Sequence, residues 1–454
     1  MLPADLPPPA HHVSCLAPAW REARPAFSDT LTSTSYPIAV HYQRTSDLAR
    51  AQRVLSAAET AWRVQVDELG WRAPVLPDAA DGPELDLYLS QVGAGSAWTA
   101  PDANTDAVHG DGHMSVPAYI AIDRNLPLSD VDLYVAHEFN HVLQFATDFS
   151  EGTLTIWEAT ANSAQSWTFG APGHWDDSVY DFQVAPWAPV LVGDGSGVSQ
   201  YIDGGWLYEY GAALWVWRID QLHGGDAAGA IALWEAASNE GWDLEPDAVD
   251  AFAAMYDGDL GAGLNDVAMV RWLTGSRWDD RGLAEARTWT SDNAVPTALT
   301  IDAIPFTGDF GDMAPMITGQ AFAELDLSAA HGDVRVDVGS ASGLHTAVIA
   351  LTWTADGTAS SVEASGVAPS LTLSADVTRA VIAVSNLGHA SWDGEDEAWV
   401  DGDQTLSIYD VGTGPGDTGD TGDEPGGGCG CDGGGTGGAG LLALLGVLAL
   451  RRRR

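Results

Sequence analysis

Two histidines and a glutamate lie within five residues, in the segment His137-Glu138-Phe139-Asn140-His141. On a helix, side chains four residues apart share a face, so His137 and His141 would lie close enough to bind one metal ion. Glu138 would lie one residue further round the helix, where its carboxylate can take a proton from water activated by the metal. We therefore expect a hydrolytic metal centre; two surface histidines on an amphipathic helix are the alternative.

A third metal ligand is expected from the segment Trp157-Glu158-Ala159-Thr160-Ala161. Glu158 lies there among apolar residues, where an unpaired carboxylate would be costly and a metal ion would offset that cost. Glu151 is the competing carboxylate, but it stands in a predicted loop beside a glycine and is expected to be solvated. The predicted ligands of zinc (Zn²⁺) are thus His137, His141 and Glu158.

Hydrophobic periodicity predicts the elements that must position these residues. Alternating apolar residues predict strands over 35–43, 85–91 and 118–125, and the third is expected to be the edge strand beside the metal centre. Apolar residues at helical spacing predict helices over 46–70, 130–147, 152–168, 208–223, 227–238 and 247–255. Both segments that carry the predicted ligands should therefore be helical.

These motifs together resemble a family of surface zinc metalloproteases of myxobacteria. The resemblance rests on the His-Glu-x-x-His-x-x-Gln-Phe segment at 137–145, on 157–161 and on Tyr-Gly-Ala at 210–212. The segments 35–43 and 67–71 fit it as well, so that it covers roughly residues 30–270. It implies a gluzincin-like zincin fold and a zinc endopeptidase activity with protein or peptide substrates.

Two positions separate this sequence from related zinc peptidases. The third histidine of the metzincin pattern is absent, because Gln144 and Thr147 occupy the places that follow His141. In the thermolysin-type site an aspartate four residues after the glutamate ligand orients a zinc histidine, but here that position is Asn162. If Asn162 faces His137, metal affinity should be lower than with a carboxylate, because residues behind the ligands tune metal binding.

Peptide hydrolysis also needs a group that stabilises the oxyanion of the tetrahedral intermediate. We select Tyr210, because Gly211 after it would allow the helix to pack close to the metal centre; an ordinary packing aromatic is the alternative. His223 is instead expected to interact with a helix C-terminus. The candidates considered are Tyr208, Tyr210, His174 and His223.

Other polar clusters could bind further metal ions. His109 and His113 could form a second metal site, although a polar loop is the commoner explanation. The Asp-rich segments 256–266 and 393–404 offer oxygen ligands that suit calcium (Ca²⁺). Solvated acidic turns are the alternative, because neither segment follows the EF-hand pattern.

The pattern changes after residue 290, where strands separated by short turns predict an antiparallel β-sandwich. Its predicted strands cover 298–304, 321–327, 333–339, 346–354, 370–375, 379–386 and 404–411. The predicted fold class is an α+β zincin-like domain, an all-β sandwich and a short C-terminal hydrophobic helix. The predicted divisions are an N-terminal leader or extended segment (1–30), the catalytic domain (31–290), the sandwich (291–412), a linker (413–438) and a hydrophobic segment (439–454).

The composition is strongly acidic, with 64 Asp and Glu against 19 basic residues and a net charge of −45. All the basic residues are arginines, so lysine-based catalysis is excluded, and broad binding of nucleic acid is excluded by the charge. At 45% hydrophobic residues with 19 tryptophans, the chain can still bury a substantial core. An acidic surface favours solubility and suits a protein outside the cell.

The C-terminal segment resembles the myxobacterial C-terminal sorting tag. Cys429 and Cys431 lie in a Gly-rich spacer, and the apolar run 439–450 leads to Arg451–Arg454. This run is shorter than the about 20 residues of a membrane span, so we expect a short anchor with a basic stop; an uninformative tail is the alternative. The resemblance implies export to the cell surface or outer membrane, or secretion once sorting machinery has removed the tag. The N-terminal residues lack a secretory signal, so we hypothesise a start upstream of Met1.

The sequence thus predicts an exported zinc metallopeptidase with Glu138 as general base and Tyr210 as oxyanion donor. The alternative is a catalytically weak or inactive zinc-binding surface protein whose β-sandwich mediates binding or adhesion. Glu138 distinguishes the two, because a structural zinc site does not need a glutamate at that position.

Overall fold

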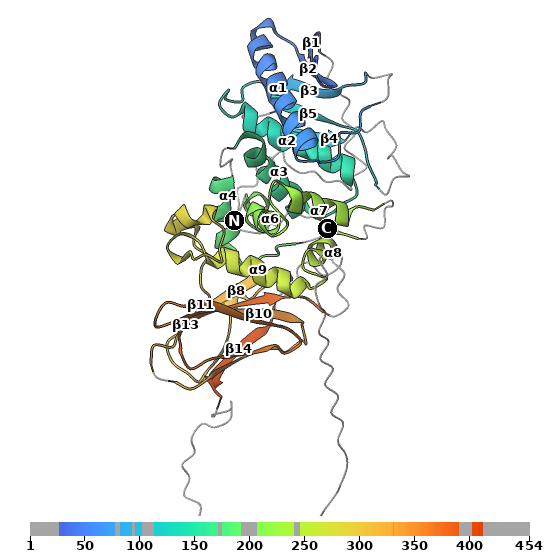
Figure 1. Ribbon diagram of the computed structural model, residues 1–454. Coiled ribbons are helices and arrows are strands. Elements are labelled where there is room, and N and C mark those ends of the chain that lie inside the picture. Colours follow the sequence, from blue (N-terminus) through green and yellow to red (C-terminus); the bar gives the residue numbers. More distant parts are fainter. Residues whose placement is uncertain are drawn as a thin grey trace, which may run out of the picture. The chain divides into compact units, whose positions relative to one another are not determined.

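The computed structural model describes residues 27–77, 82–92, 96–101, 113–170, 175–191, 207–239, 246–329, 331–389 and 402–411. These residues form a mixed α+β structure with three β-sheets (Figure 1). Several predicted features lie outside the described residues: His109, His174, most of 393–404, nearly all of 1–30, the linker 413–438 and the segment 439–454. The described residues contain no helix that is long and apolar enough to cross a membrane.

The first sheet has the strand order β1-β2-β3-β5-β4. Its strands are β1 (Asp29–Thr32), β2 (Ile38–Tyr42), β3 (Leu85–Ser90), β4 (Ala97–Pro101) and β5 (Ala118–Asp123). The three central strands are parallel and largely buried, as expected for strands covered on both faces. The predicted edge position of the 118–125 strand is wrong. β4, which the periodicity missed, pairs antiparallel with β5 and forms that edge of the sheet instead.

The predicted helices are present, with changed limits. They are α1 (Leu48–Ala61), continued by a π-helical segment η2 (Trp62–Glu68), α2 (Val131–Thr147), α3 (Leu154–Phe169), α5 (Tyr208–Gly211), α6 (Ala213–Leu222), α7 (Ala228–Ala237) and α8 (Ala248–Ala254). Two α-helices of the described residues were not predicted: α4 (Trp175–Val184) and α9 (Leu260–Trp272). Gly170 ends α3 in the left-handed conformation, with φ 65°, which glycine adopts without strain.

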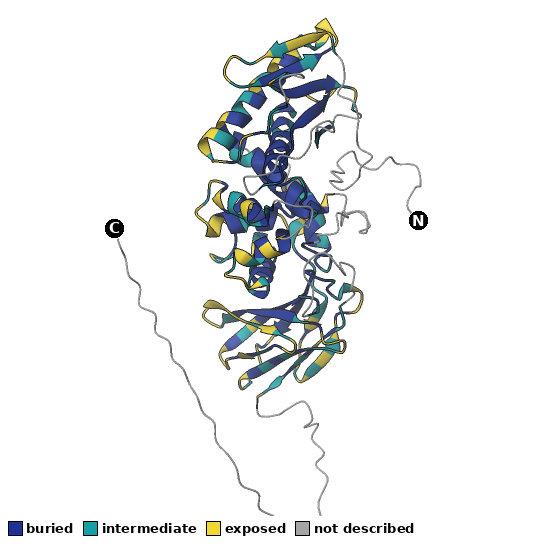
Figure 2. Cartoon of the chain, turned by 90° about the vertical axis from the view of Figure 1, so that its right-hand side faces the viewer, coloured by how far each residue is buried: buried dark blue, intermediate teal, exposed yellow. Residues whose placement is uncertain are grey.

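Helix α2, which carries His137 and His141, is deeply buried. It packs against α1, α3 and the strands β4 and β5. Fourteen of its 17 residues are buried, including every residue from Val135 to Thr147 (Figure 2). An apolar helix surrounded in this way holds its polar side chains in fixed surroundings.

The C-terminal strands form two sheets around one apolar core. The orders are β11-β10-β13-β8-β6 and β12-β9-β14-β7. The strands are β6 (Leu299–Ile301), β7 (Phe306–Asp309), β8 (Gln320–Asp326), β9 (Val334–Ser340), β10 (Thr346–Thr354), β11 (Ala359–Gly366), β12 (Ser370–Leu373), β13 (Val377–Asn386) and β14 (Gln404–Asp410). Strands β7 and β11 were not predicted. The predicted antiparallel pairing is found for the other strand pairs of the two sheets, but β6 runs parallel to β8.

The sheet β11-β10-β13-β8-β6 is covered on both faces along its central strands β10, β13 and β8, which are largely buried, whereas β11 is mostly exposed. One face lines the core between the two sheets, and the other packs against α9 (Figure 1). Met269 and Trp272 of α9 share an apolar cluster with Phe322, Ile349 and Val381 of this sheet. The described residues accordingly form one compact unit.

Candidate metal centre

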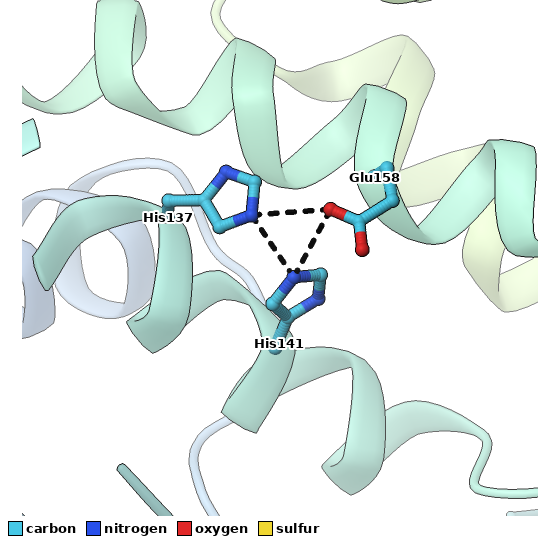
Figure 3. Close-up of side chains that lie close together, drawn as sticks. All are labelled: His137, His141 and Glu158. Atoms are coloured by element: carbon cyan, nitrogen blue, oxygen red, sulfur yellow. Dashed lines mark hydrogen bonds and ion pairs between the residues drawn. The ribbon is translucent and has the colours of Figure 1, made fainter. Parts of the chain in front are cut away.

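Two packed helices bring the three predicted metal ligands together. His137 and His141 lie on α2 and Glu158 lies on α3, and their side chains point toward one another (Figure 3). The two imidazole Nε2 atoms are 3.1 Å apart. Glu158 Oε2 lies 3.2 Å from His137 Nε2 and 3.6 Å from His141 Nε2. Within the described residues, this is the one group of three His, Cys, Asp or Glu side chains close enough to share a metal ion.

The donor set and its burial fit a metal ion. All three residues are at most 5% exposed, and Glu158 Oε2, although close to both imidazole Nε2 atoms, makes no hydrogen bond of regular geometry to the described residues. Burial alone would raise the pKa of Glu158, but the imidazoles of His137 and His141 hold that pKa well below its usual range. Two imidazole nitrogens and one carboxylate are ligands that zinc prefers, with a fourth position left for water or substrate.

Burial and charge act in opposite directions on His141. Desolvation favours its neutral form, but the carboxylates of Glu158 and Glu138 and the Gln144 amide raise its pKa overall. A proton on the imidazole and a metal ion would compete for the same nitrogen. Metal binding at this site should therefore become stronger as the pH rises.

Amide side chains contact the outward-facing nitrogens of both histidines. Gln144 Oε1 lies 2.6 Å from His141 Nδ1, and Gln165 Nε2 lies 3.5 Å from His137 Nδ1. Asn162 does not take the orienting place considered for it: its amide donates to the Tyr210 carbonyl oxygen at 3.0 Å. The amide thus fixes the backbone of α5 rather than an imidazole.

Strand β4 supplies a contact to Glu138 that the sequence did not reveal. Thr99 Oγ1 donates to Glu138 Oε2 at 2.7 Å and also lies 2.9 Å from the Glu138 carbonyl oxygen. Glu138 is 2% exposed, and its charge contributes to the raised pKa values of His141 and Tyr210. The carboxylate therefore lies close to both groups, held by the edge strand.

Tyr210 lies beside the predicted ligands. Its ring stacks on His137, with centroids 5.6 Å apart and planes 14° from parallel. Burial and the nearby carboxylates of Glu158 and Glu138 raise the pKa of Tyr210 well above its ordinary value. The hydroxyl therefore keeps its proton and can donate it in a hydrogen bond.

The other oxyanion candidates within the described residues have different surroundings. The Tyr208 hydroxyl donates to the Ala188 carbonyl oxygen at 3.0 Å, and burial raises the pKa of Tyr208 to about 12. His223 lies at the end of α6, with Nε2 3.2 Å from the Met255 carbonyl oxygen at the end of α8. Both contacts are those of structural groups.

Glu151 is not solvated, contrary to the expectation from its neighbouring glycine. It is 3% exposed, and Oε1 accepts a hydrogen bond from the Thr153 backbone amide at 2.6 Å. Burial, together with the charges of Asp247 and Asp148, raises its pKa to about 8. These neighbours come from α8 and from the end of α2, and sequence spacing does not show how tertiary packing encloses a loop.

The clusters considered for further metal ions have other roles among the described residues. His113 Nδ1 lies 2.6 Å from Ser238 Oγ, and His113 Nε2 lies 3.5 Å from Glu235 Oε2. In the 256–266 segment, Asp259 caps α9 and Asp266 pairs with Arg218 at 2.8 Å. Within the described residues, neither cluster places three metal-binding side chains together.

Comparisons with known proteins identify no family for this chain. No protein-family model matches it, and no curated protein matches it. Among solved structures it is similar to the pre-peptidase C-terminal domain of collagenase from Bacillus anthracis, with 13% sequence identity and a TM-score of 0.17. This similarity covers 25% of the chain and 97% of that domain. A similarity at this level supports no inference about activity.

Proposed function

We propose that this protein is a zinc metallopeptidase of gluzincin-like zincin type. The observation that carries the proposal is the buried convergence of His137, His141 and Glu158, with ligand atoms 3.1–3.6 Å apart. The resemblance of 137–145 and 157–161 to surface metalloproteases of myxobacteria supports it. Glu138 adds the proton-transfer group that a purely structural zinc site would not need.

Zinc held by the three ligands would polarise the peptide carbonyl group and lower the pKa of water. Glu138 takes a proton from water as the water oxygen bonds to the carbonyl carbon. It then gives that proton to the amide nitrogen as the carbon–nitrogen bond breaks, which leaves a carboxylic acid and an amine. The hydrogen bond from Thr99 holds the Glu138 carboxylate in place through both transfers.

Tyr210 is the proposed donor to the oxyanion. Its raised pKa keeps the hydroxyl protonated, so it can stabilise negative charge as the carbonyl carbon becomes tetrahedral. Stacking on His137 fixes the ring beside the ligands. A preorganised donor of this kind needs no rearrangement at the moment of reaction.

The proposed setting is outside the cell. The sorting-tag resemblance of 429–454 and the acidic composition support export, with the cell surface or the medium as destination and sorting machinery as a partner. The substrates would be proteins or peptides, and the C-terminal sandwich belongs to the same compact unit as the proposed catalytic residues.

The test compares wild type with Glu138→Gln, using Glu324→Gln on sandwich strand β8 as the control. Glu138→Gln should keep zinc but cleave casein or peptides about 10²–10⁴-fold more slowly, because it removes the general base. Glu324→Gln should match wild type in both measurements. Zinc-loaded wild type and Glu138→Gln with equal cleavage rates would overturn the mechanism.

A further inference from the structure

Three buried amide side chains connect the π-helical segment η2 to His141, one of the proposed metal ligands. Gln65 lies on η2, and Asn140 and Gln144 lie on α2; all three are 0% exposed. Gln65 bonds to Asn140 at 3.1 Å, Asn140 bonds to Gln144 at 3.1 Å, and Gln144 contacts His141 at 2.6 Å. This chain of hydrogen-bonded amides thus links His141 to a residue about 75 positions earlier in the sequence.

The direction of each hydrogen bond follows from backbone carbonyl groups, which can only accept. Gln65 Nε2 lies 3.0 Å from the Ala136 carbonyl oxygen, so the amide nitrogen must face that side. Gln65 Oε1 then accepts from Asn140 Nδ2, and Asn140 Oδ1 accepts from Gln144 Nε2. A flipped amide at Gln65 would place two oxygens against each other.

A second carbonyl group fixes the other end of the chain. Gln144 Nε2 donates to the Trp157 carbonyl oxygen at 3.0 Å, so Oε1 must face His141 Nδ1. An oxygen at that position requires a proton on Nδ1. Neutral His141 must then present an unprotonated Nε2, which is the atom directed at His137 and Glu158.

We propose that Gln65, Asn140 and Gln144 are positioning residues that hold His141 in the tautomer whose Nε2 lone pair binds the metal. The inference rests on the proposed metal centre and adds residues outside its ligand set. Groups behind a ligand often include a carboxylate, which adds charge. This chain of neutral amides fixes the tautomer and ring orientation without adding charge, and a buried network with satisfied hydrogen bonds is rigid.

The experiment measures zinc affinity by competition with a chromogenic chelator, together with urea unfolding of the metal-free proteins. The variants are Gln144→Met and Gln65→Met. The control is Gln183→Met, because Gln183 is also 0% exposed and donates to two backbone carbonyl oxygens, those of Arg271 and Asn293. All three variants lose buried amide hydrogen bonds, but Gln183 is not part of the chain to His141.

Gln144→Met should weaken zinc binding about 10–100-fold, and Gln65→Met should weaken it toward the lower end of that range. Gln183→Met should lower the free energy of unfolding while leaving zinc affinity unchanged. Unchanged zinc affinity in folded Gln65→Met would overturn the positioning role of the amide chain without contradicting the proposed metal centre. A wild type that binds no zinc would overturn both proposals.

A measurement on metal-free wild type tests the tautomer without relying on a variant that folds. Nitrogen-15 NMR of the histidine side chains, at alkaline pH where His141 is neutral, should show the proton of His141 on Nδ1. Loss of the signals in His141→Ala assigns them. A predominant Nε2–H tautomer at His141 would overturn the proposal.

Discussion

The side chains at the proposed metal centre are matched in charge as well as in position. Glu158 is buried, yet its pKa is held low by two imidazoles, so the carboxylate stays ionised inside the protein. His141 has a raised pKa because Glu158 and Glu138 lie near it. Without a metal ion, a proton on an imidazole supplies the positive charge that attracts the Glu158 carboxylate. A divalent cation would supply this positive charge instead, so the ionised carboxylate can be stable although it is buried.

Replacing Tyr210 by Phe tests the oxyanion donor. We expect kcat to fall about 10²–10³-fold while KM and zinc content stay close to wild type, because the lost hydrogen bond forms in the transition state. Tyr208→Phe is the matched control: its hydroxyl bonds to the Ala188 carbonyl oxygen, so the change should affect stability and not kcat. Equal losses of kcat in the two variants would contradict the assignment.

Glu151 predicts a pH-dependent difference in stability. Its pKa is about 8 in the folded protein and 4.5 as the ordinary value, so between these values the unfolded chain loses a proton that the folded chain retains. The contribution of Glu151 to wild-type stability should therefore be greatest below pH 4.5 and fall as the pH rises to 8. Glu151→Gln removes this cost. Its advantage in urea unfolding should grow by about 1.4 kcal/mol per pH unit between pH 5 and pH 8.

The control for this pH series is Glu285→Gln, at an exposed position. It should follow the wild-type curve at every pH. If Glu151→Gln were less stable than wild type at pH 8, the carboxylate would have to be ionised and compensated by a cation in the folded protein.

The sequence identified those site residues that can be recognised from the pattern of a single helix. His137 and His141 share one helix face, and Glu158 stands out because it interrupts an apolar helix. Thr99 lies 39 residues from Glu138, on a five-residue strand whose sequence has no clear alternation. The role of Thr99 and the burial of Glu151 depend on which distant segments pack together, and neither spacing nor composition specifies that.

Among the secondary structure elements, α2 and α3 determine the geometry of the site. Long apolar periodicity made both predictable, whereas the short strand β4 and helix α4 lack such a pattern. Helix α4 matters because it packs against α5, which carries Tyr210. Correct placement of Tyr210 therefore depends on an element that the sequence did not predict.

Gly211→Ala tests the close contact between α4 and α5. A Cβ atom at this position would lie 2.3 Å from the Ser178 carbonyl oxygen and 2.7 Å from Phe182 Cβ. Because a backbone atom must move, we expect a loss of about 1–3 kcal/mol in the free energy of unfolding. Displacement of the neighbouring Tyr210 should also lower kcat.

The matched control is Gly332→Ala, where the nearest atom to an added Cβ is 3.9 Å away. Its stability should stay within about 0.5 kcal/mol of wild type. Comparable destabilisation at the two positions in urea unfolding would show that the contact between α4 and α5 is not tight.

At the scale of the whole molecule, the helical part and the sandwich each have an apolar cluster of their own, and a third cluster lies where α9 meets the sandwich. Trp272 of α9 packs against Phe322 of the sandwich, and buried Arg271 bonds to the Phe182 carbonyl oxygen of α4 and to Gln320 of β8. Helix α4 in turn contacts α5. The sandwich is therefore continuous with the helices that support the proposed catalytic residues.

The most direct test of the account is the zinc content of three purified proteins after dialysis against dilute zinc: wild type, Glu158→Gln and Glu151→Gln. The two substitutions make the same chemical change at two buried glutamates seven residues apart in the sequence. We expect about one zinc per chain in wild type and Glu151→Gln, and far less in Glu158→Gln. Full zinc content in Glu158→Gln, or no zinc in wild type, would contradict it.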